Sequence, residues 1–214
     1  MPKPLHFEKM QLYAITDRTL FPSVEELVRQ TALWAKGGVD FIQIREKDLA
    51  AEELYALSVR IVHAVKATGG HTRVLQNGSP EIAAETGCDG FHLTAGLPST
   101  AIAAAKTVVS RVVANPVISI SCHTVPEIEI ARDAGATLAL FAPVFEKQSG
   151  PEIVSGQGLD ALAHACRVAA PMPVFALGGV TAENAQKCIQ AGATGIAGIR
   201  LFAHHEWRNL CLSG

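Results

Sequence analysis

The chain has 214 residues, 49% of them hydrophobic, and a formal net charge of −2. This length suffices for one well-buried core, so we expect a single domain over residues 1–214. The near-neutral charge gives no reason to expect nucleic acid or an anionic membrane surface as a partner. Five cysteines without a C-x-x-C pair argue against a disulfide framework or a zinc site. No signal peptide or membrane-spanning run is apparent, which favours the cytoplasm.

One pattern recurs about every fifty residues: the end of a helix, a capping glycine, and a buried strand. Its four copies are Lys36–Ile42, Thr86–His92, Ala134–Leu140 and Ala191–Ala197. The sequence predicts four further strands between them, at 11–16, 73–76, 116–121 and 172–177, and helices at 24–35, 51–66, 126–134 and 159–168. Alternating strands and helices pair in parallel with right-handed crossovers. The pattern therefore favours a single (β/α)8 TIM barrel, with an open doubly wound sheet as the alternative.

Catalytic groups of such barrels lie at the C-terminal ends of the strands. After the second strand, alternation places Gln43, Arg45 and Lys47 on one side of an extended segment. These donors suit a phosphate or a carboxylate, although a solvated cluster with Glu46 and Asp48 is the alternative. Asn77 follows the third strand, where it could orient a heteroaromatic ring or bond to neighbouring backbone.

The fourth and fifth strands bring two histidines. His92 is expected to be a barrel-core residue with its hydrogen bonds satisfied. His123 lies just past the fifth strand, where an imidazole can transfer protons near neutral pH. A surface-loop histidine is an equal alternative at that position, and the adjacent Cys122 is not expected to be a nucleophile. Residues 146–158, rich in Gly, Ser and charge, predict a mobile lid.

Late in the chain, an apolar run ends in a Gly-Gly pair, and Thr181 stands where a helix through Gln190 would begin. Glycines allow close approach of a ligand, and a helix N-terminus suits an anion. Two neighbouring strands with Gly-rich ends match the phosphate site after strands 7 and 8 of a TIM barrel. Two ordinary turns are the alternative. The predicted phosphate ligands are Gly178, Gly179, Val180, Gly198 and Arg200.

Across the whole barrel, the chain resembles the thiamine phosphate synthase/TenI family. The matching segments are Tyr13–Asp17, Gln43–Asp48, Asp89–Leu93, Pro143–Phe145, and Ala176–Thr181 with Asn184. The resemblance implies a barrel that handles thiazole phosphate, the phosphorylated half of thiamine. One branch, the synthase, joins an aminopyrimidine diphosphate to thiazole phosphate with magnesium. The other, TenI, resembles a thiazole tautomerase, which moves a proton to aromatise carboxythiazole phosphate without a metal or cofactor.

Departures from the synthase pattern favour the TenI branch. Gly78 and Leu97 stand near the places where the synthase has carboxylates, which Mg²⁺ prefers as ligands. The synthase's Thr-x-Thr-Lys after strand 6 is replaced by Glu146-Lys147-Gln148. The TenI-like features are Asn77-Gly78, Ala95-Gly96, His123 and Phe145-Glu146.

The resemblance implies that His123 is the general acid/base of a tautomerase. The Gly178–Gly179 segment would bind the substrate phosphate, Arg45 and Lys47 a carboxylate, and Asn77 the ring. The alternatives are a synthase that tolerates the lost acids, which alone would need magnesium, and a non-catalytic thiazole-phosphate-binding or regulatory protein. Arg200 replaces a usual Ser, which would alter the phosphate site. The apolar helices favour a homo-oligomer.

Overall fold

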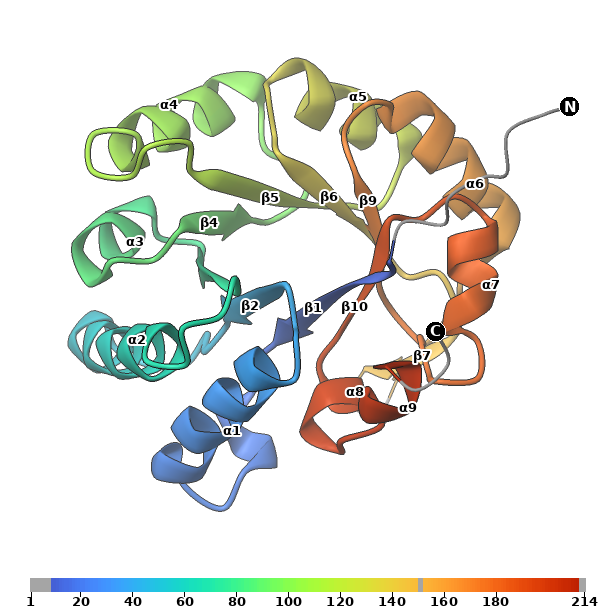
Figure 1. Cartoon of the computed structure of the whole chain (residues 1–214). Helices are drawn as coiled ribbons and strands as arrows, with labels where there is room; N and C mark the ends of the chain where they lie inside the picture. The colour runs from blue at the N-terminus through green and yellow to red at the C-terminus, as the bar shows by residue number, and fades with distance from the viewer. Residues whose placement is uncertain (1–8, 150–151, 212–214) are drawn as a thin grey trace, which may run out of the picture.

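The computed structural model describes residues 9–149 and 152–211, and eight parallel strands in it form a closed barrel (Figure 1). The strand order around the barrel is β1-β10-β9-β6-β5-β4-β3-β2. This arrangement confirms the predicted (β/α)8 TIM barrel. The barrel strands are β1 (Gln11–Ile15), β2 (Phe41–Ile44), β3 (Arg73–Asn77), β4 (Gly90–Leu93), β5 (Val117–Cys122), β6 (Leu138–Phe141), β9 (Val174–Ala176) and β10 (Gly195–Gly198).

Helices follow the strands and surround the barrel (Figure 1). Within the described residues none is long and apolar enough to cross a bilayer. The helices are η1 (Arg18–Leu20), α1 (Val24–Lys36), α2 (Ala51–Lys66), α3 (Pro80–Thr86), α4 (Ser99–Val109), α5 (Val125–Asp133), α6 (Gly158–Ala169), α7 (Ala185–Gln190), α8 (Arg200–Ala203) and α9 (Arg208–Cys211).

Side-chain alternation along the strands divides the core into two layers. On β1, Tyr13 and Ile15 belong to the cluster inside the barrel, together with Phe175. Leu12 and Ala14 point the other way, into the larger cluster between strands and helices. The inner cluster is therefore closed by large side chains, and any ligand must be bound at an end of the barrel.

The repeated helix-glycine-strand pattern has the expected backbone origin. Gly38, Gly87, Gly135 and Gly192 all have positive φ, between 74° and 101°. Only glycine adopts this left-handed conformation without strain, and it ends the helix before the next strand begins. The pattern therefore marks β2, β4, β6 and β10, as the sequence predicted.

Two segments differ from the prediction. Residues 146–158, predicted as a mobile lid, include two short antiparallel strands that the sequence did not predict, β7 (Lys147–Ser149) and β8 (Glu152–Val154), and the mobility of this segment stays a prediction. The helix expected from Thr181 instead begins at Ala185, as α7.

Candidate active site

The three residues predicted to bind an anion after β2 do not lie in one row. Gln43 is buried inside the barrel, where its Nε2 donates to Asn77 Oδ1 at 2.9 Å. Asn77 is thus held at the end of β3 by a neighbouring side chain. The strand ends at Ile44, so the predicted alternation does not continue to Lys47, which is exposed in a turn. The three residues therefore do not form one continuous row of donors.

The acidic neighbours of Arg45 and Lys47 are engaged elsewhere. Asp48 accepts two hydrogen bonds from the Arg18 guanidinium, at 2.6 and 2.7 Å. Glu46 is buried and accepts from Thr16 Oγ1 at 2.6 Å and from the Arg18 backbone N–H. Among the described residues, no carboxylate forms an ion pair with Arg45 or Lys47. In the alternative of a solvated charge cluster, Glu46 and Asp48 would be the partners of these cations, whereas both acids contact Arg18.

His123 lies in the loop after β5, with its side chain exposed. Its Nδ1 is 2.7 Å from the Ala142 carbonyl oxygen, which can only accept. Nδ1 therefore carries the hydrogen, and in the neutral ring Nε2 keeps a free lone pair. This is the protonation pattern that a general base needs.

Two further residues, not predicted from the sequence, contact either this histidine or its carbonyl partner. Glu127, in the first turn of α5, accepts from the backbone N–H groups of both His123 and Thr124. Thr124 Oγ1 in turn accepts from the Glu127 backbone, which completes a capping box. Gln157 Nε2 donates to the Ala142 oxygen at 3.0 Å. The Thr-x-x-Glu spacing could have revealed the first of these contacts.

The other reactive side chains nearby are poor catalysts. His92 is buried, and both ring nitrogens have partners, Ser119 and Ser121. Burial, with a smaller effect of the Arg45 cation, lowers the pKa of His92 to about 3. Burial raises the pKa of the Cys122 thiol to about 12, so little thiolate forms near neutral pH. His92 is the satisfied core residue that the sequence predicted.

The Gly178–Gly179 turn is shaped first by the protein's own backbone. A Cβ on Gly178 would lie 2.7 Å from Pro143, and one on Gly179 would lie 2.4 Å from the Glu146 carbonyl oxygen. Both glycines also have positive φ. The sequence argument attributed them to close approach of a ligand, whereas the structure shows close approach of the segment after β6. In the described part of the chain, the N–H groups of Gly179 and Val180 donate no hydrogen bond.

The regular helix begins at Ala185, one turn later than the sequence predicted, so the helix dipole at this turn stays a prediction. The Thr181 N–H donates to Asn184 Oδ1 at 2.9 Å, and Asn184 Nδ2 donates to the Gly179 carbonyl at 2.9 Å. The Thr181 N–H is therefore already used within the turn. The free N–H groups of Gly179 and Val180 remain available for an anion.

The remaining predicted phosphate ligands follow the neighbouring strand. Phe175 of β9 pairs with Gly195 of β10, and Ala176 with Ile196. Gly198 is the last residue of β10. Arg200 is exposed in the first turn of α8. The two glycine-rich segments thus follow neighbouring strands, and phosphate binding there stays a prediction.

Magnesium, which the synthase branch would require, does not fit the side chains that follow β3 and β4. Asn77, Gly78, Thr94 and Gly96 offer no carboxylate there. Over residues 9–149 and 152–211, no three His, Cys, Asp or Glu side chains are grouped so that they could hold a metal ion. Mg²⁺ sites in proteins usually use one or two carboxylates besides substrate phosphates.

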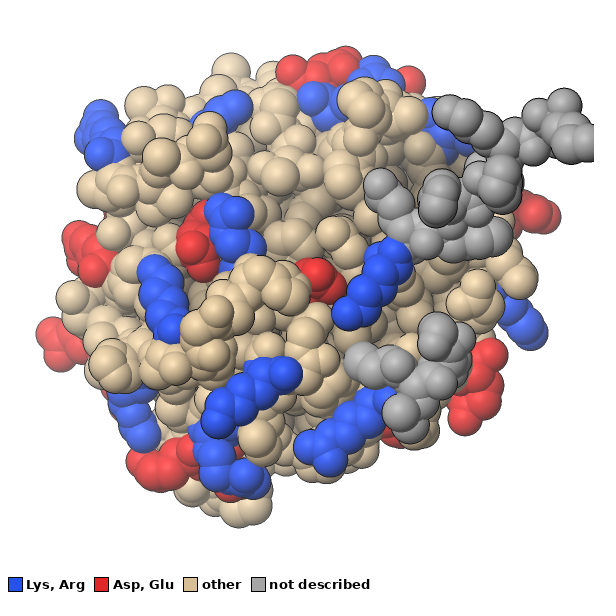
Figure 2. Space-filling view, viewed as in Figure 1, with Lys and Arg blue, Asp and Glu red and all other residues tan. Residues whose placement is uncertain are grey.

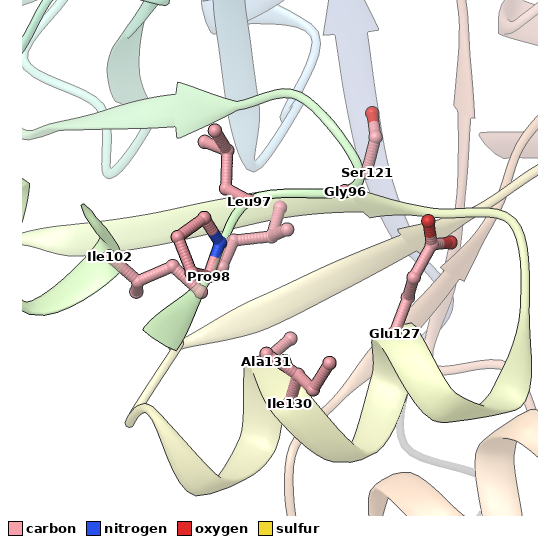
Figure 3. Close-up of a pocket in the computed structure, with 9 residues that line it drawn as sticks. Gly96, Leu97, Pro98, Ile102, Ser121, Glu127, Ile130 and Ala131 are labelled. Atoms are coloured by element: carbon pink, nitrogen blue, oxygen red, sulfur yellow. The ribbon is translucent and has the colours of Figure 1, made fainter. Parts of the chain in front are cut away.

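A small hollow lies between the loop after β4 and α5, and Ser121 and Glu127 are among the residues that line it. Figure 3 shows Leu97, Pro98 and Ile102 on one side, and Ile130, Ala131 and Glu127 of α5 near them. Its volume is about 200 Å³, below the roughly 300–1,000 Å³ of typical ligand pockets. The hollow is therefore smaller than a typical ligand pocket.

Charged side chains do not suggest a large polyanionic partner. On the face drawn in Figure 2, Lys and Arg side chains are spread with Asp and Glu among them, and gather most closely over α1 and α8. Nucleic-acid binding proteins usually carry a clustered basic surface and a high net positive charge. The net charge of −2 and this mixed surface instead suit a small ligand.

Comparison with known proteins gives one consistent family. Residues 12–202 match the family model described as thiamine monophosphate synthase. A "Putative thiamine-phosphate synthase 2" of Aquifex aeolicus is 34% identical over 91% of this chain and 98% of its own length. The thiamine-phosphate synthase of Methanospirillum hungatei is 32% identical, over 87% of this chain and 86% of its own. The solved thiamine phosphate pyrophosphorylase of Pyrococcus furiosus superposes with a TM-score of 0.76 at 26% identity, covering 95% of this chain and 93% of that one.

Proposed function

The chain belongs to the thiamine monophosphate synthase family, and we propose that it is an enzyme of thiamine biosynthesis that acts on thiazole phosphate. The family match over residues 12–202 carries this proposal. Two features of the barrel end support it: within residues 9–149 and 152–211, the N–H groups of Gly179 and Val180 donate no hydrogen bond, and Arg45 and Lys47 form no ion pair. Two anion sites suit a substrate with a phosphate and a second negative group.

The names of the relatives favour the coupling reaction of the synthase over the tautomerase predicted from the sequence. The side chains at the site favour the tautomerase, because they offer no carboxylates for magnesium after β3 and β4, and His123 has a free Nε2. We retain the proton transfer as the first candidate on the chemistry of these side chains alone. The coupling reaction is the second candidate.

In the proton transfer, Nε2 of His123 takes a proton from the saturated ring carbon of the thiazole isomer. The electron pair released there moves through the ring, and a proton is delivered to the exocyclic alkene carbon. The Ala142 carbonyl accepts from Nδ1–H and stabilises the imidazolium that forms in between. Free N–H groups at Gly179 and Val180 would hold the phosphate, and Asn77 would orient the ring.

One assay distinguishes the candidates. The protein is incubated with each thiazole isomer, with and without aminopyrimidine diphosphate and magnesium, and aromatisation is followed by ultraviolet absorbance. The first candidate predicts isomerisation without magnesium, and a loss on the order of 10²–10⁴-fold in His123→Ala. His164→Ala, which removes an exposed histidine of α6, is the control. Magnesium-dependent coupling without isomerisation would establish the second candidate, and binding without either reaction would indicate the non-catalytic alternative.

A further inference from the structure

A chain of hydrogen bonds crosses the barrel interior between Asn77 and Ser121. Its four inner members, Gln43, Tyr13, Ser119 and His92, are at most 3% exposed, and its two ends are half-buried. The bonds, in order from Asn77, are Gln43 Nε2 to Asn77 Oδ1 (2.9 Å), Tyr13 OH with Gln43 Oε1 (3.1 Å), Tyr13 OH with Ser119 Oγ (3.1 Å), His92 Nδ1 with Ser119 Oγ (2.8 Å) and His92 Nε2 with Ser121 Oγ (2.9 Å).

Each hydroxyl group has a single proton, and this fixes the direction of the first bonds. Gln43 turns its Nε2 to Asn77 and therefore its Oε1 to Tyr13. An amide oxygen only accepts, so the Tyr13 hydroxyl donates to it. Because the Tyr13 proton is then used, Ser119 must donate to the Tyr13 oxygen. The Ser119 proton is used in turn, so Nδ1 of His92 carries a hydrogen and donates to Ser119.

The protonation states of the two titratable members complete the argument. His92 is neutral near pH 7, because burial and the Arg45 cation lower its pKa to about 3. A neutral imidazole has one N–H, so Nε2 accepts and Ser121 donates to it. Burial also raises the pKa of Tyr13 well above its usual value, which keeps its hydroxyl protonated. All five bonds therefore run in one direction, from Ser121 to Asn77.

We propose that Tyr13 and Ser119 are positioning residues that set the hydrogen-bonding polarity of the two ends of this chain. Asn77 receives a bond on its oxygen and so offers its amide N–H groups to a ligand. The Ser121 proton is committed to His92, so Ser121 offers only lone pairs. A ligand that contacts both ends must present an acceptor to Asn77 and a donor to Ser121.

Only the identity of the ligand rests on the proposed function. In that case an unprotonated thiazole nitrogen or a carboxylate of the substrate would be the acceptor that Asn77 contacts. The direction of the chain does not depend on that identity. If the Gln43 amide were turned over, every bond would reverse: Asn77 would donate inward, and Nε2 of His92 would carry the hydrogen. The tautomer of His92 therefore reports the polarity of both ends.

The experiment is ¹⁵N NMR of protein labelled at histidine, with the His92 signals assigned from a His92→Asn variant. We expect the Nδ1–H tautomer in the unaltered protein near pH 7. In Tyr13→Phe, Ser119 loses its acceptor and can donate to His92, so the signals should shift toward the Nε2–H tautomer. Tyr55→Phe, at the exposed tyrosine of α2, is the matched control and should leave the His92 signals unchanged.

Ser119→Ala provides a second interruption of the chain and gives a result even if Tyr13→Phe does not fold. It removes the acceptor of Nδ1–H, and a shift toward Nε2–H is again expected. An Nε2–H tautomer in the unaltered protein would overturn the proposed polarity. Nδ1–H signals that persist unchanged in both variants would show that Tyr13 and Ser119 do not set the tautomer. Neither readout uses a substrate, so a failure here is distinct from a failure of the proposed function.

Discussion

Replacing Glu127 with alanine should weaken both the start of α5 and the loop that carries His123. The carboxylate accepts from the backbone N–H groups of His123 and Thr124, so its removal leaves two donors to water. A hydrogen bond to a charged group contributes about 1.5–3 kcal/mol when it is buried, and a helix cap about 0.5–2 kcal/mol. Because Glu127 is only half-buried, solvent screening reduces these values. We expect a loss of about 1–2 kcal/mol in the free energy of unfolding.

The activity of Glu127→Ala should fall less than that of His123→Ala. The Ala142 carbonyl still orients the imidazole, so a several-fold decrease is expected instead of the roughly 10²-fold or larger loss from removing the base. Urea unfolding and the isomerisation rate measure the two effects. Glu129→Ala, at an exposed acid of the same helix, is the control and should change neither. If Glu127→Ala matched this control in both measurements, the capping contact would not hold the His123 loop.

Three other perturbations follow from the described contacts. Burial raises the pKa of Glu46 above 4.5 in the folded protein, so folding favours its protonated form. The stability that this preference contributes is fully present below pH 4.5 and is lost as the pH rises through the folded pKa. The unfolding free energy of the unaltered protein relative to Glu46→Gln should therefore decrease with rising pH above 4.5, and a flat difference would contradict the burial effect. Gly90→Ala would place a Cβ 1.9 Å from the Val117 carbonyl oxygen and should lower the free energy of unfolding by about 3 kcal/mol or more. In the control Gly70→Ala, the nearest atom to the new Cβ is at 3.4 Å, and the free energy of unfolding should change by no more than about 0.5 kcal/mol in the same denaturation experiment. Calorimetric titration of the ligand-free protein with magnesium should show only weak binding, and tight binding would revive the metal-dependent coupling reaction.

The barrel could be predicted because its signals are local. Each helix-glycine-strand copy needs a few adjacent residues, and the left-handed Gly87 and Gly135 occupy the predicted positions. The regular helix expected from Thr181 begins at Ala185, after a turn in which the Asn184 side chain bonds to Thr181 and Gly179, a detail that the apolar pattern does not report. The hairpin after β6 was missed because its short strands do not alternate between apolar and polar residues.

The site shows the same division between local and distant signals. The position of His123 after β5 follows from the order of the strands, and its loop could be placed from the sequence. The contact of His123 with Ala142 and the buried contact of Tyr13 with Ser119 could not be predicted. Tyr13 and Ser119 are 106 positions apart, and no local sequence pattern relates them. Such partners follow from closure of the barrel, which brings distant strands together. Phosphate binding at Gly179 and Val180 and the homo-oligomer stay predictions.

The segment that leaves the barrel after β6 returns to the place where it left. The Gln157 N–H donates to the Pro143 carbonyl and the Gly158 N–H to the Val144 carbonyl, both at 2.9 Å. The Val144 and Phe145 N–H groups donate to Leu177 and Gly178 beside β9. The excursion from the barrel therefore begins and ends at residues that hydrogen-bond to one another, so its length does not affect the position of the barrel strands. A change of length between Phe145 and Gln157 should therefore leave the barrel strands in place, so this excursion, beside the proposed phosphate site at Gly178 and Gly179, is a position where an engineer could graft a segment with a new substrate preference.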